Sequence, residues 1–381
     1  MEWVKLGDVG KIITGNTPSK KNKAYYDSPD INFVSPGDIV ENNRINELVK
    51  SENHISNSAR EKARIVPKNS ILVTCIGIIG KVAKVKINEV AFNQQINAIV
   101  VDENKYDIDY IAYAIMANKR KLSSIANAAV VPLLNKSQFS DFKIFIAKSL
   151  EKQKEISSFL NKIENLIQTR QDQVQALDDL VDSVFDQMFG ALKTNKTRLK
   201  NLIKFNNKNI NDFENYFDFY YIGVEDIEKD TGNILSRAKV SDVDIKSSKK
   251  FFTDENILYS RIRPNLNKVA LPDFSGLIST EVYVLECSDK INKYFLTHVL
   301  RSNRFVKYAM LNSTGANFPR VSQQAIEGYS LYLPPIEKQN LFAAFVEKIE
   351  KQKQILNDSL VELTDLFDSL MQDAFDGSLT K

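Results

Sequence analysis

Ser149-Leu150-Glu151-Lys152-Gln153 recurs 186 residues later (Glu151 to Glu337) as Pro335-Ile336-Glu337-Lys338-Gln339. Each stretch opens a long segment in which apolar residues are regularly spaced. The first segment ends near Asp182-Ser183-Val184 and the second near Asp368-Ser369-Leu370, at the same offset. A repeat of this length is too long for a solenoid unit, which would recur every few tens of residues. The sequence therefore predicts two copies of one module, each a globular part followed by a long helix.

The globular parts repeat more loosely than the helices. Ile71-Leu72 and Lys81-Val82-Ala83 correspond to Ile257-Leu258 and Lys268-Val269-Ala270. We expect an α+β protein with two similar mixed α/β globular domains, separated by two long antiparallel coiled-coil helices and related by a pseudo-two-fold internal repeat. The expected boundaries are 1–148 and 191–334 for the globular domains, and 149–190 and 335–381 for the central and C-terminal helices.

The two long segments carry the seam of a coiled coil. From Ile156 and from Phe342, apolar residues follow each other in alternating steps of four and three, which is the 3.5-residue repeat of paired helices. We expect antiparallel pairing, because the globular domain between the helices allows the chain to return. The predicted seam residues are Ile156, Leu160, Ile163, Ile167, Val174, Leu177, Val181, Val184, Phe342, Val346, Ile349, Leu356, Leu360, Leu363, Phe367 and Leu370.

Two charged residues interrupt the seam, Arg170 in the first helix and Lys353 in the second. One interpretation is that they fix the register of the pair, as polar seam residues can. The other is that their long stems lie along the edge of the seam while the charged groups reach water. We favour the second interpretation.

Charge alternates along the chain. The net charge of the whole sequence is +3, but the globular segments 1–148 and 191–334 carry +6 and +5, and each helical segment carries −4. A basic globular domain suits a partner rich in phosphate, whereas an acidic helix repels DNA and suits a protein partner. We therefore expect the globular domains to bind DNA and the helices to bind protein subunits.

Residues for catalysis or metal binding are scarce. The two cysteines, Cys75 and Cys287, stand in no metal-binding spacing, and the sequence has only two histidines. Gly77-Ile78-Ile79-Gly80-Lys81 is too short for a nucleotide-binding P-loop and lacks the trailing hydroxyl residue. The sequence therefore predicts a binding protein and not an enzyme, with no metal site. Without a long apolar stretch or a signal-peptide pattern, we expect a cytoplasmic protein with no membrane contact.

Basic, amide and aromatic residues gather around turns in both globular domains. Arg and Lys suit guanine edges, Asn and Gln suit adenine edges, and further Lys residues can hold phosphates. For any single Lys cluster we favour a solvated surface over DNA contact. We favour DNA contact for the run from Arg261 to Lys268, which repeats a Gly/Lys turn of the first domain. The predicted DNA-binding residues are Lys20, Lys21, Lys23, Tyr25, Gln94, Asn127, Lys136, Arg261, Arg263, Asn265, Lys268, Thr314, Asn317 and Arg320.

Short motifs, in their order and duplication, resemble those of the specificity subunit of type I restriction–modification systems. The resemblance covers nearly the whole chain. In the first domain, Ala147-Lys148-Ser149-Leu150 departs from the double proline that leads into the helix in this family. The matching stretches are Gly15-Asn16-Thr17-Pro18, Tyr25-Tyr26, Val34-Ser35-Pro36-Gly37-Asp38-Ile39, Phe92-Asn93-Gln94-Gln95, Tyr221-Ile222-Gly223-Val224-Glu225-Asp226-Ile227, Arg263-Pro264-Asn265-Leu266-Asn267-Lys268 and Leu333-Pro334-Pro335-Ile336-Glu337-Lys338-Gln339.

The resemblance implies two target-recognition domains that each read one half of a bipartite, asymmetric site in double-stranded DNA. It also implies that the helices set the gap between the half-sites and dock two modification subunits, which methylate adenine, and that restriction subunits join them. No cofactor is then expected on this chain, and S-adenosylmethionine, ATP and Mg2+ are expected on the partners. The alternatives are a coiled-coil scaffold or protein-interaction module without DNA readout, and a nuclease with an unrecognised site.

Overall fold

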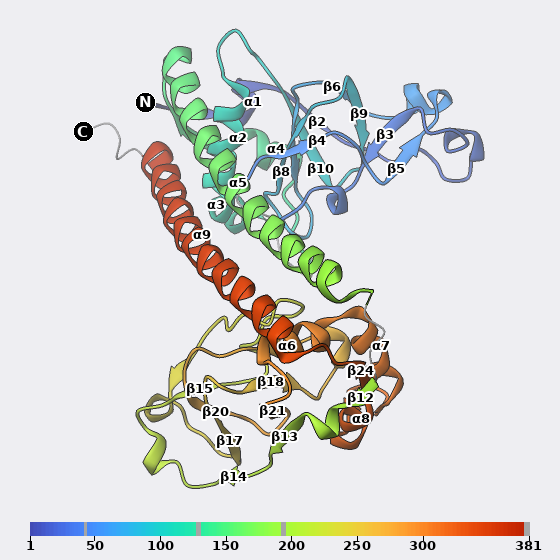
Figure 1. Cartoon of the computed structure of the whole chain (residues 1–381). Helices are drawn as coiled ribbons and strands as arrows, with labels where there is room; N and C mark the ends of the chain where they lie inside the picture. The colour runs from blue at the N-terminus through green and yellow to red at the C-terminus, as the bar shows by residue number, and fades with distance from the viewer. Residues whose placement is uncertain (42–43, 127–130, 192–195, 377–381) are drawn as a thin grey trace. The chain divides into compact units, whose positions relative to one another are not determined.

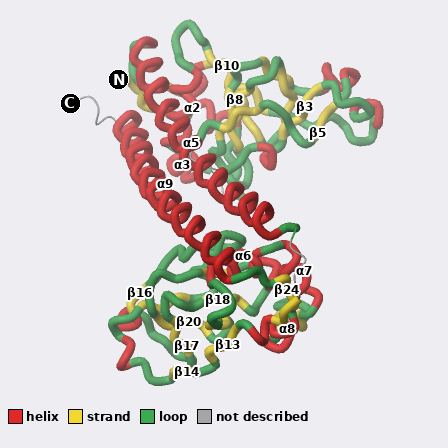
Figure 2. The backbone as a smooth tube through the Cα atoms, viewed as in Figure 1, coloured by secondary structure: helices red, strands yellow, loops and turns green. Residues whose placement is uncertain are grey.

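The computed structural model describes residues 1–41, 44–126, 131–191 and 196–376. The chain divides into two compact units, Met1–Asp172 with Asn357–Lys381, and Gln173–Leu356. Two long helices, α5 (Leu150–Phe189) and α9 (Ile336–Asp376), each contribute one segment to each unit. Figure 1 shows α5 in green and α9 in red, and Figure 2 shows the strands of the globular domains in yellow. The predicted boundaries between globular and helical segments stay a prediction.

The first globular domain contains two mixed sheets and a short antiparallel pair. The pair joins β1 (Glu2–Lys5) to β11 (Lys143–Ile146), the strand that leads into α5. One sheet has the order β2 (Gly10–Thr14), β10 (Ile96–Val101), β7 (Ile71–Thr74), β8 (Val82–Val85), β4 (Asn46–Leu48). The other sheet has the order β5 (Asn53–Ile55), β3 (Ile31–Val34), β9 (Glu89–Phe92), β6 (Ile65–Pro67). The short helices are α1 (Leu6–Val9), α2 (Ile108–Ala117), α3 (Lys119–Ser124) and α4 (Lys136–Asp141).

The second globular domain repeats this plan. The strand pair β12 (Lys196–Arg198) and β24 (Ser330–Tyr332) precedes α9 as β1 and β11 precede α5. One sheet has the order β13 (Ile203–Asn206), β21 (Val282–Cys287), β18 (Ile257–Ser260), β19 (Val269–Ala270). The other has the order β14 (Asn209–Ile210), β17 (Lys249–Phe252), β20 (Gly276–Ser279), β15 (Tyr220–Ile222), β16 (Ala238–Lys239). The remaining elements are α6 (Lys293–Arg301), α7 (Asn303–Leu311), β22 (Ser313–Thr314), β23 (Arg320–Val321) and α8 (Gln323–Gly328).

Corresponding central strands divide their side chains between two cores. In β7, Ile71 and Val73 join the core that includes α2, whereas Leu72 joins the core behind the sheet. In β18, Ile257 and Tyr259 join the core that includes α6, whereas the next residue, Leu258, joins the opposite core. Alternate residues of a strand point to opposite faces, so both faces of these strands are covered and the strands read as continuous apolar runs.

The two long helices pack against each other in opposite directions within each unit. In the second unit, Asp178 contacts Lys353, whereas Phe185 and Phe189, further along α5, contact Phe342, further back along α9. In the first unit, the early part of α5 shares a core with the late part of α9. The antiparallel pairing predicted from the sequence is confirmed.

The predicted seam faces inward in both units, and none of its residues is exposed. Leu160, Ile163 and Ile167 are buried in the core of the first unit together with Phe367. In the second unit Phe342 is fully buried, and the remaining seam residues are buried or half-buried. The 3.5-residue repeat thus places one continuous apolar stripe of each helix against its partner and its globular domain.

The structure corrects the preferred interpretation for Lys353, and for Arg170 that interpretation stays a prediction. Its side chain is only 11% exposed, and its Nζ lies 2.7 Å from Asp178 Oδ1 on the other helix and 3.1 Å from Glu350 Oε1 on its own. The ammonium is therefore held between two acids and does not reach freely into water. An ion pair between two helices favours one register of their seam when one partner is buried, because any slip would leave the buried ammonium of Lys353 unpaired.

Candidate nucleic-acid interface

The loops that follow β7 and β18 share one backbone frame. The first spans Cys75–Lys81 and the second spans Arg261–Lys268, one residue longer. In each, three backbone hydrogen bonds tie the start of the loop to the neighbouring strand and to the later segment that precedes the last short helix. The matching bonds are Cys75 N to Gln95 O and Arg261 N to Glu281 O, Gly77 N to Pro132 O and Arg263 N to Pro319 O, and Leu134 N to Cys75 O and Val321 N to Arg261 O.

Both loops need left-handed backbone at two corresponding positions. Gly77 and Gly80 have φ of 76° and 84°, and Arg263 and Asn267 have φ of 48° and 49°. Glycine adopts this conformation at little cost, whereas a non-glycine residue loses roughly 1 kcal/mol or more there. The second domain therefore accepts backbone strain at Arg263 in a loop that the first domain builds with glycine.

Arg263 and its neighbours form the exposed tip of the second domain's loop. The Arg263 guanidinium lies 4.6 Å from the centre of the Phe318 ring, which is 50% exposed. The pairing of Arg263 N with Pro319 O brings the β22–β23 hairpin, with its exposed Thr314 and Asn317, to the same loop. Asn265 is also exposed, on the short 3-10 turn of Pro264–Leu266. The structure thus brings together four of the predicted residues: Arg263, Asn265, Thr314 and Asn317.

Lys268 has a structural role. Its Nζ donates a hydrogen bond to the carbonyl of Val224 at 2.8 Å, and Lys81 Nζ donates to the carbonyl of Pro36 at 3.0 Å in the first domain. Both acceptors stand two residues before an aspartate that caps its own turn. Because this contact occupies the ammonium in both copies, the position of Lys268 does not support the predicted DNA contact.

Arg320 is also committed to a partner. Its Nε and Nη2 donate to the two carboxylate oxygens of Glu281, at 2.9 and 3.3 Å, and this carboxylate raises the pKa of Arg320. A bidentate pair fixes both groups in one geometry. Arg320 therefore anchors β23, and the structure does not present it as a free reader of bases. Arg261 lies differently, with its guanidinium 5.4 Å from the centre of the Tyr283 ring in a polar cleft.

The predicted residues of the first domain lie in two groups. Lys20, Lys21 and Lys23 are exposed in the loop after β2. Gln94 accepts a hydrogen bond from Thr17 Oγ1 at 2.8 Å, which ties its turn to the start of that loop.

Tyr25 is half-buried in a small core and supports the loop after β2 from inside. Lys136 is exposed at the first position of α4, away from the Thr17–Gln94 contact in sequence, and no contact joins it to these residues within the described parts of the chain. Asn127 lies outside the described residues.

Exposed apolar residues at the loop tips are not among the DNA-binding residues predicted from the sequence. Ile78, Val131 and Leu133 are 50%, 54% and 40% exposed in the first domain, and Phe318 is the counterpart of Val131 in the second. Apolar side chains that surround a polar loop can contact thymine methyl groups or base edges. The signal was available in the repeat, because Pro132 and Pro319 align these segments.

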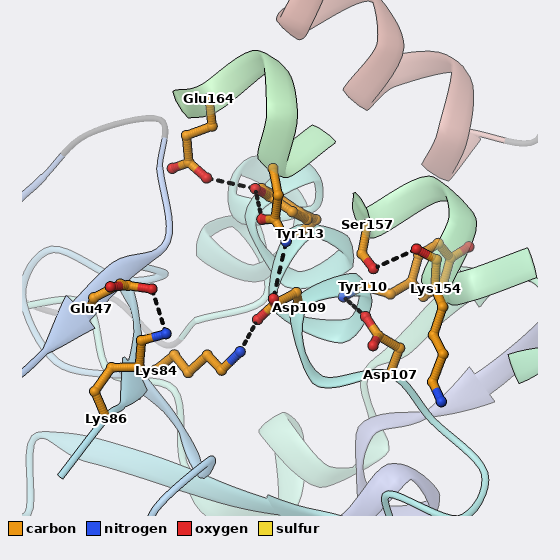
Figure 3. A network of polar contacts seen from close by, with 11 residues as sticks. Glu47, Lys84, Lys86, Asp107, Asp109, Tyr110, Tyr113, Lys154, Ser157 and Glu164 are labelled. Atoms are coloured by element: carbon orange, nitrogen blue, oxygen red, sulfur yellow. Dashed lines mark hydrogen bonds and ion pairs between the residues drawn. The ribbon is translucent and has the colours of Figure 1, made fainter. Parts of the chain in front are cut away.

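A half-buried polar network holds the first domain against α5 (Figure 3). Lys84 Nζ lies 2.5 Å from Asp109 Oδ1, and Asn161 Nδ2 of α5 donates to Asp109 Oδ2 at 3.1 Å. The hydroxyl of Tyr113 lies 2.6 Å from Glu164 Oε2, and burial raises the pKa of both groups. Because each polar group has a partner, the network fixes the angle at which this domain meets its helix segment.

No metal or reactive thiol site is found in the described part of the chain. No group of three or more His, Cys, Asp or Glu side chains there could hold a metal ion. Burial raises the pKa of Cys75 and of Cys287 to about 12, so both thiols stay protonated near neutral pH. Among the helices of the described residues, none combines the length and apolar character needed to span a bilayer.

Comparisons with known proteins agree on one family. The family model described as "Type I restriction modification DNA specificity domain" matches residues 1–176 and 192–365. The chain is 22% identical over 335 residues to the type I restriction enzyme EcoDI specificity subunit of Escherichia coli, covering 76% of this chain and 74% of that protein. It is 24% identical over 389 residues to the MjaIX specificity subunit of Methanocaldococcus jannaschii, covering 92% and 88%.

A solved structure supports the fold independently. The S subunit of a type I restriction–modification system from M. genitalium superposes with a TM-score of 0.63, covering 98% of this chain and 96% of that chain. The sequence identity is 14%, so this likeness concerns the fold alone. The predicted fold class, two similar globular domains with two long antiparallel helices, is confirmed.

Proposed function

The chain belongs to the type I restriction–modification DNA specificity family, and from this premise we propose that it reads a bipartite, asymmetric site in double-stranded DNA, one half with each globular domain. As a specificity subunit, it is the non-catalytic component that gives the complex its DNA sequence recognition.

One observation carries the proposal of two different half-sites. The loops after β7 and β18 keep the same backbone hydrogen bonds and the same left-handed positions, yet their side chains differ in kind. The first loop presents glycine and the exposed Ile78, whereas the second presents Arg263 and Asn265. Two loops with the same backbone conformation but different side chains suit the recognition of two different DNA half-sites, because donors, acceptors and methyl contacts select different bases.

We assign the protein partners to the outer faces of the long helices. In the first unit α5 exposes Phe159 and Leu166, seven residues apart and 51% and 49% exposed. In the second unit it exposes Leu180, at 43%. Apolar residues at heptad spacing on an exposed face suit a helical or grooved protein partner, and the acidic charge of the helices disfavours DNA there. The proposed partners are two modification subunits, with restriction subunits joining the complex.

The cofactors of the complex are proposed to lie on those partners. Methylation of adenine needs S-adenosylmethionine, and translocation and cleavage need ATP and Mg2+. On this proposal the chain selects the site at which the partners act.

The decisive experiment is methylome sequencing of a strain that carries this chain as its sole specificity subunit. We expect one methylated motif made of two dissimilar half-sites around a gap of unspecified bases. A second strain would carry residues 261–268 replaced by the loop of a relative. A change confined to one half-site supports the division of labour, and a change in both halves or in neither contradicts it.

A further inference from the structure

Two cations of the second globular domain share one aromatic ring. Lys250 of β17 has its Nζ 5.3 Å from the centre of the Tyr283 ring, and Arg261 has its guanidinium carbon 5.4 Å from the same centre. Neither forms an ion pair with an acid among the residues that the structure describes. Glu281, close to Tyr283 in sequence, is engaged by Arg320.

Lys250 is buried and Arg261 is half-buried, and both have few partners. Lys250 is only 6% exposed, and its Nζ makes one long hydrogen bond of 3.4 Å, to the carbonyl of Val282. The Nε of Arg261 is buried and has no hydrogen-bond partner within the described residues. Burial, and then the charge of Arg261, lower the pKa of Lys250. A buried charge is costly unless an anion compensates it, and the nearby charge of Arg261 adds to this cost at Lys250 in the unliganded protein.

The two cations line a cleft whose other walls are neutral. Among the residues that the structure describes, no carboxylate lines the cleft. The remaining lining residues supply amides and hydroxyls: Asn207, Asn209, Ser247, Ser248, Thr280, Tyr283 and Gln323. Two positive groups with hydroxyl and amide donors, and without a competing acid, match the chemistry of a phosphate group.

The first domain shows that the fold itself does not require this charge. Cys75 occupies the position of Arg261, and Asn97 occupies the position of Tyr283 in the matching strand. There, Thr14 Oγ1 donates to Asn97 Oδ1 at 2.6 Å, and Asn97 Nδ2 donates to Cys75 Sγ at 3.2 Å. A closed, neutral network thus fills the place that the second domain gives to Arg261 and Tyr283.

We propose that Lys250 and Arg261 form a binding site for one phosphate group, present in the second globular domain and absent from the first. The phosphate comes either from the DNA backbone or from free inorganic phosphate. The proposed site lies at the base of the loop whose tip presents Arg263 and Asn265, which favours a phosphate of the DNA backbone. This assignment to DNA rests on the proposed function. The site would hold the strand in register while the tip contacts base edges.

The first arm of the test needs no DNA. Thermal unfolding of the full chain would be followed with increasing inorganic phosphate, against chloride at equal ionic strength. We expect phosphate to raise the unfolding temperature of the wild type, and Lys250→Met and Arg261→Met to lose that increment. Lys246→Met is the matched control, because Lys246 is exposed, pairs with Asp244 and lies outside the cleft. No increment in the wild type, or an increment kept by both cleft variants, overturns the site.

The second arm identifies the source of the phosphate. DNA affinity of the chain, assembled with its modification subunits, would be measured against salt concentration. If the site holds the DNA backbone, each cleft variant lowers the slope of log K on log salt by about 0.9, on target and non-target DNA alike. If free phosphate raises the unfolding temperature but the cleft variants leave the slope of log K on log salt unchanged, the site binds a free anion and does not bind the DNA backbone. A wild type that binds no DNA contradicts the proposed function, while the first arm still decides the site.

Discussion

Gln153 and Gln339 make the same pair of hydrogen bonds in their two units. The Oε1 of each accepts a backbone N–H from the residue that caps a short helix, Asp107 before α2 and Asn292 before α6, at 2.9 Å in both. The acceptors for Nε2 are the carbonyl oxygens of Ala147 and Pro334, at 2.7 and 2.8 Å. Both side chains are buried, 1% and 0% exposed. The glutamine of the repeated Glu-Lys-Gln motif therefore joins each long helix to its globular domain.

Replacing either glutamine should destabilise the unit that contains it. Gln153→Ala and Gln339→Ala each leave a buried N–H and a buried carbonyl unpaired, so we expect each to lower the free energy of unfolding by about 1–3 kcal/mol. The double variant should lose roughly the sum, because the two sites share no partners. Urea unfolding followed by circular dichroism measures both. Gln352→Ala, at an exposed position of α9, is the control and should change little.

The internal repeat could be predicted from the sequence because the residues that recur are those that connect the secondary-structure elements of each copy. Gln153 and Gln339 recur in the Glu-Lys-Gln motif, and Lys81 and Lys268 recur before the same apolar pair. The seam residues could also be predicted from the 3.5-residue period, because burial of one face of a helix requires an apolar residue at nearly every turn. These residues make contacts within the chain, and the same contacts are needed in both copies.

The candidate site was less predictable, because the sequence does not show whether a Lys or Arg side chain is bound by other residues of the protein or is free to bind DNA. Lys268 and Arg320 proved to be tied to Val224 and Glu281, and only the folded chain brings these partners together. Phe318 was missed because an exposed aromatic residue and a core aromatic residue have the same letter. Long-range contacts decide which polar groups are free, and local patterns do not record them.

His298 should make the second unit sensitive to mild acid. Its side chain is 19% exposed, and its ring lies 4.0 Å from the ring of Phe185. Burial, and then the charge of Arg301, lower its pKa from 6.5 to about 4. The imidazole is therefore neutral at pH 7, and its approach to Asp182 Oδ1, at 3.6 Å, is not an ion pair at that pH.

Proton binding determines the direction in which the free energy of unfolding changes with pH. Between pH 6.5 and 4 the unfolded chain binds a proton at His298 and the folded chain does not, so the stability that is full above pH 6.5 falls as the pH decreases. The loss should approach about 3 kcal/mol near pH 4. Urea unfolding of the wild type and His298→Leu at several pH values isolates this contribution as the difference between them. His54→Leu serves as the comparison, and an equal pH dependence in the wild type and His298→Leu would refute the assignment.

Substitutions in the second loop should separate base reading from support. Arg263→Ala and Asn265→Ala remove exposed groups, so we expect each to lower discrimination at one half-site by about 1–3 kcal/mol without unfolding the chain. Lys268→Met should instead lower stability, because the Val224 carbonyl loses its donor, and Lys81→Met should do the same in the first domain. Competition binding with singly substituted sites measures discrimination. If Lys268→Met changes base preference and Arg263→Ala does not, the two roles are reversed.

Docking of the modification subunits can be tested on faces of α5 that the fold leaves free. Asp178 is unsuitable for such a test, because it holds the buried ammonium of Lys353 and its loss should damage the fold itself. Asp179 is exposed, and among the described residues its side chain is bound by Gln175 of its own helix, at 3.0 Å, so Asp179→Lys tests the surface without breaking a contact between the helices. Phe159→Asp and Leu166→Asp test the apolar residues of the same helix. We expect the latter two to reduce co-purification with the modification subunits most strongly and all three to unfold like the wild type. Normal assembly by all three variants would exclude these faces of α5 as the docking surface, whereas weaker assembly accompanied by lower stability would point to a defect of the fold.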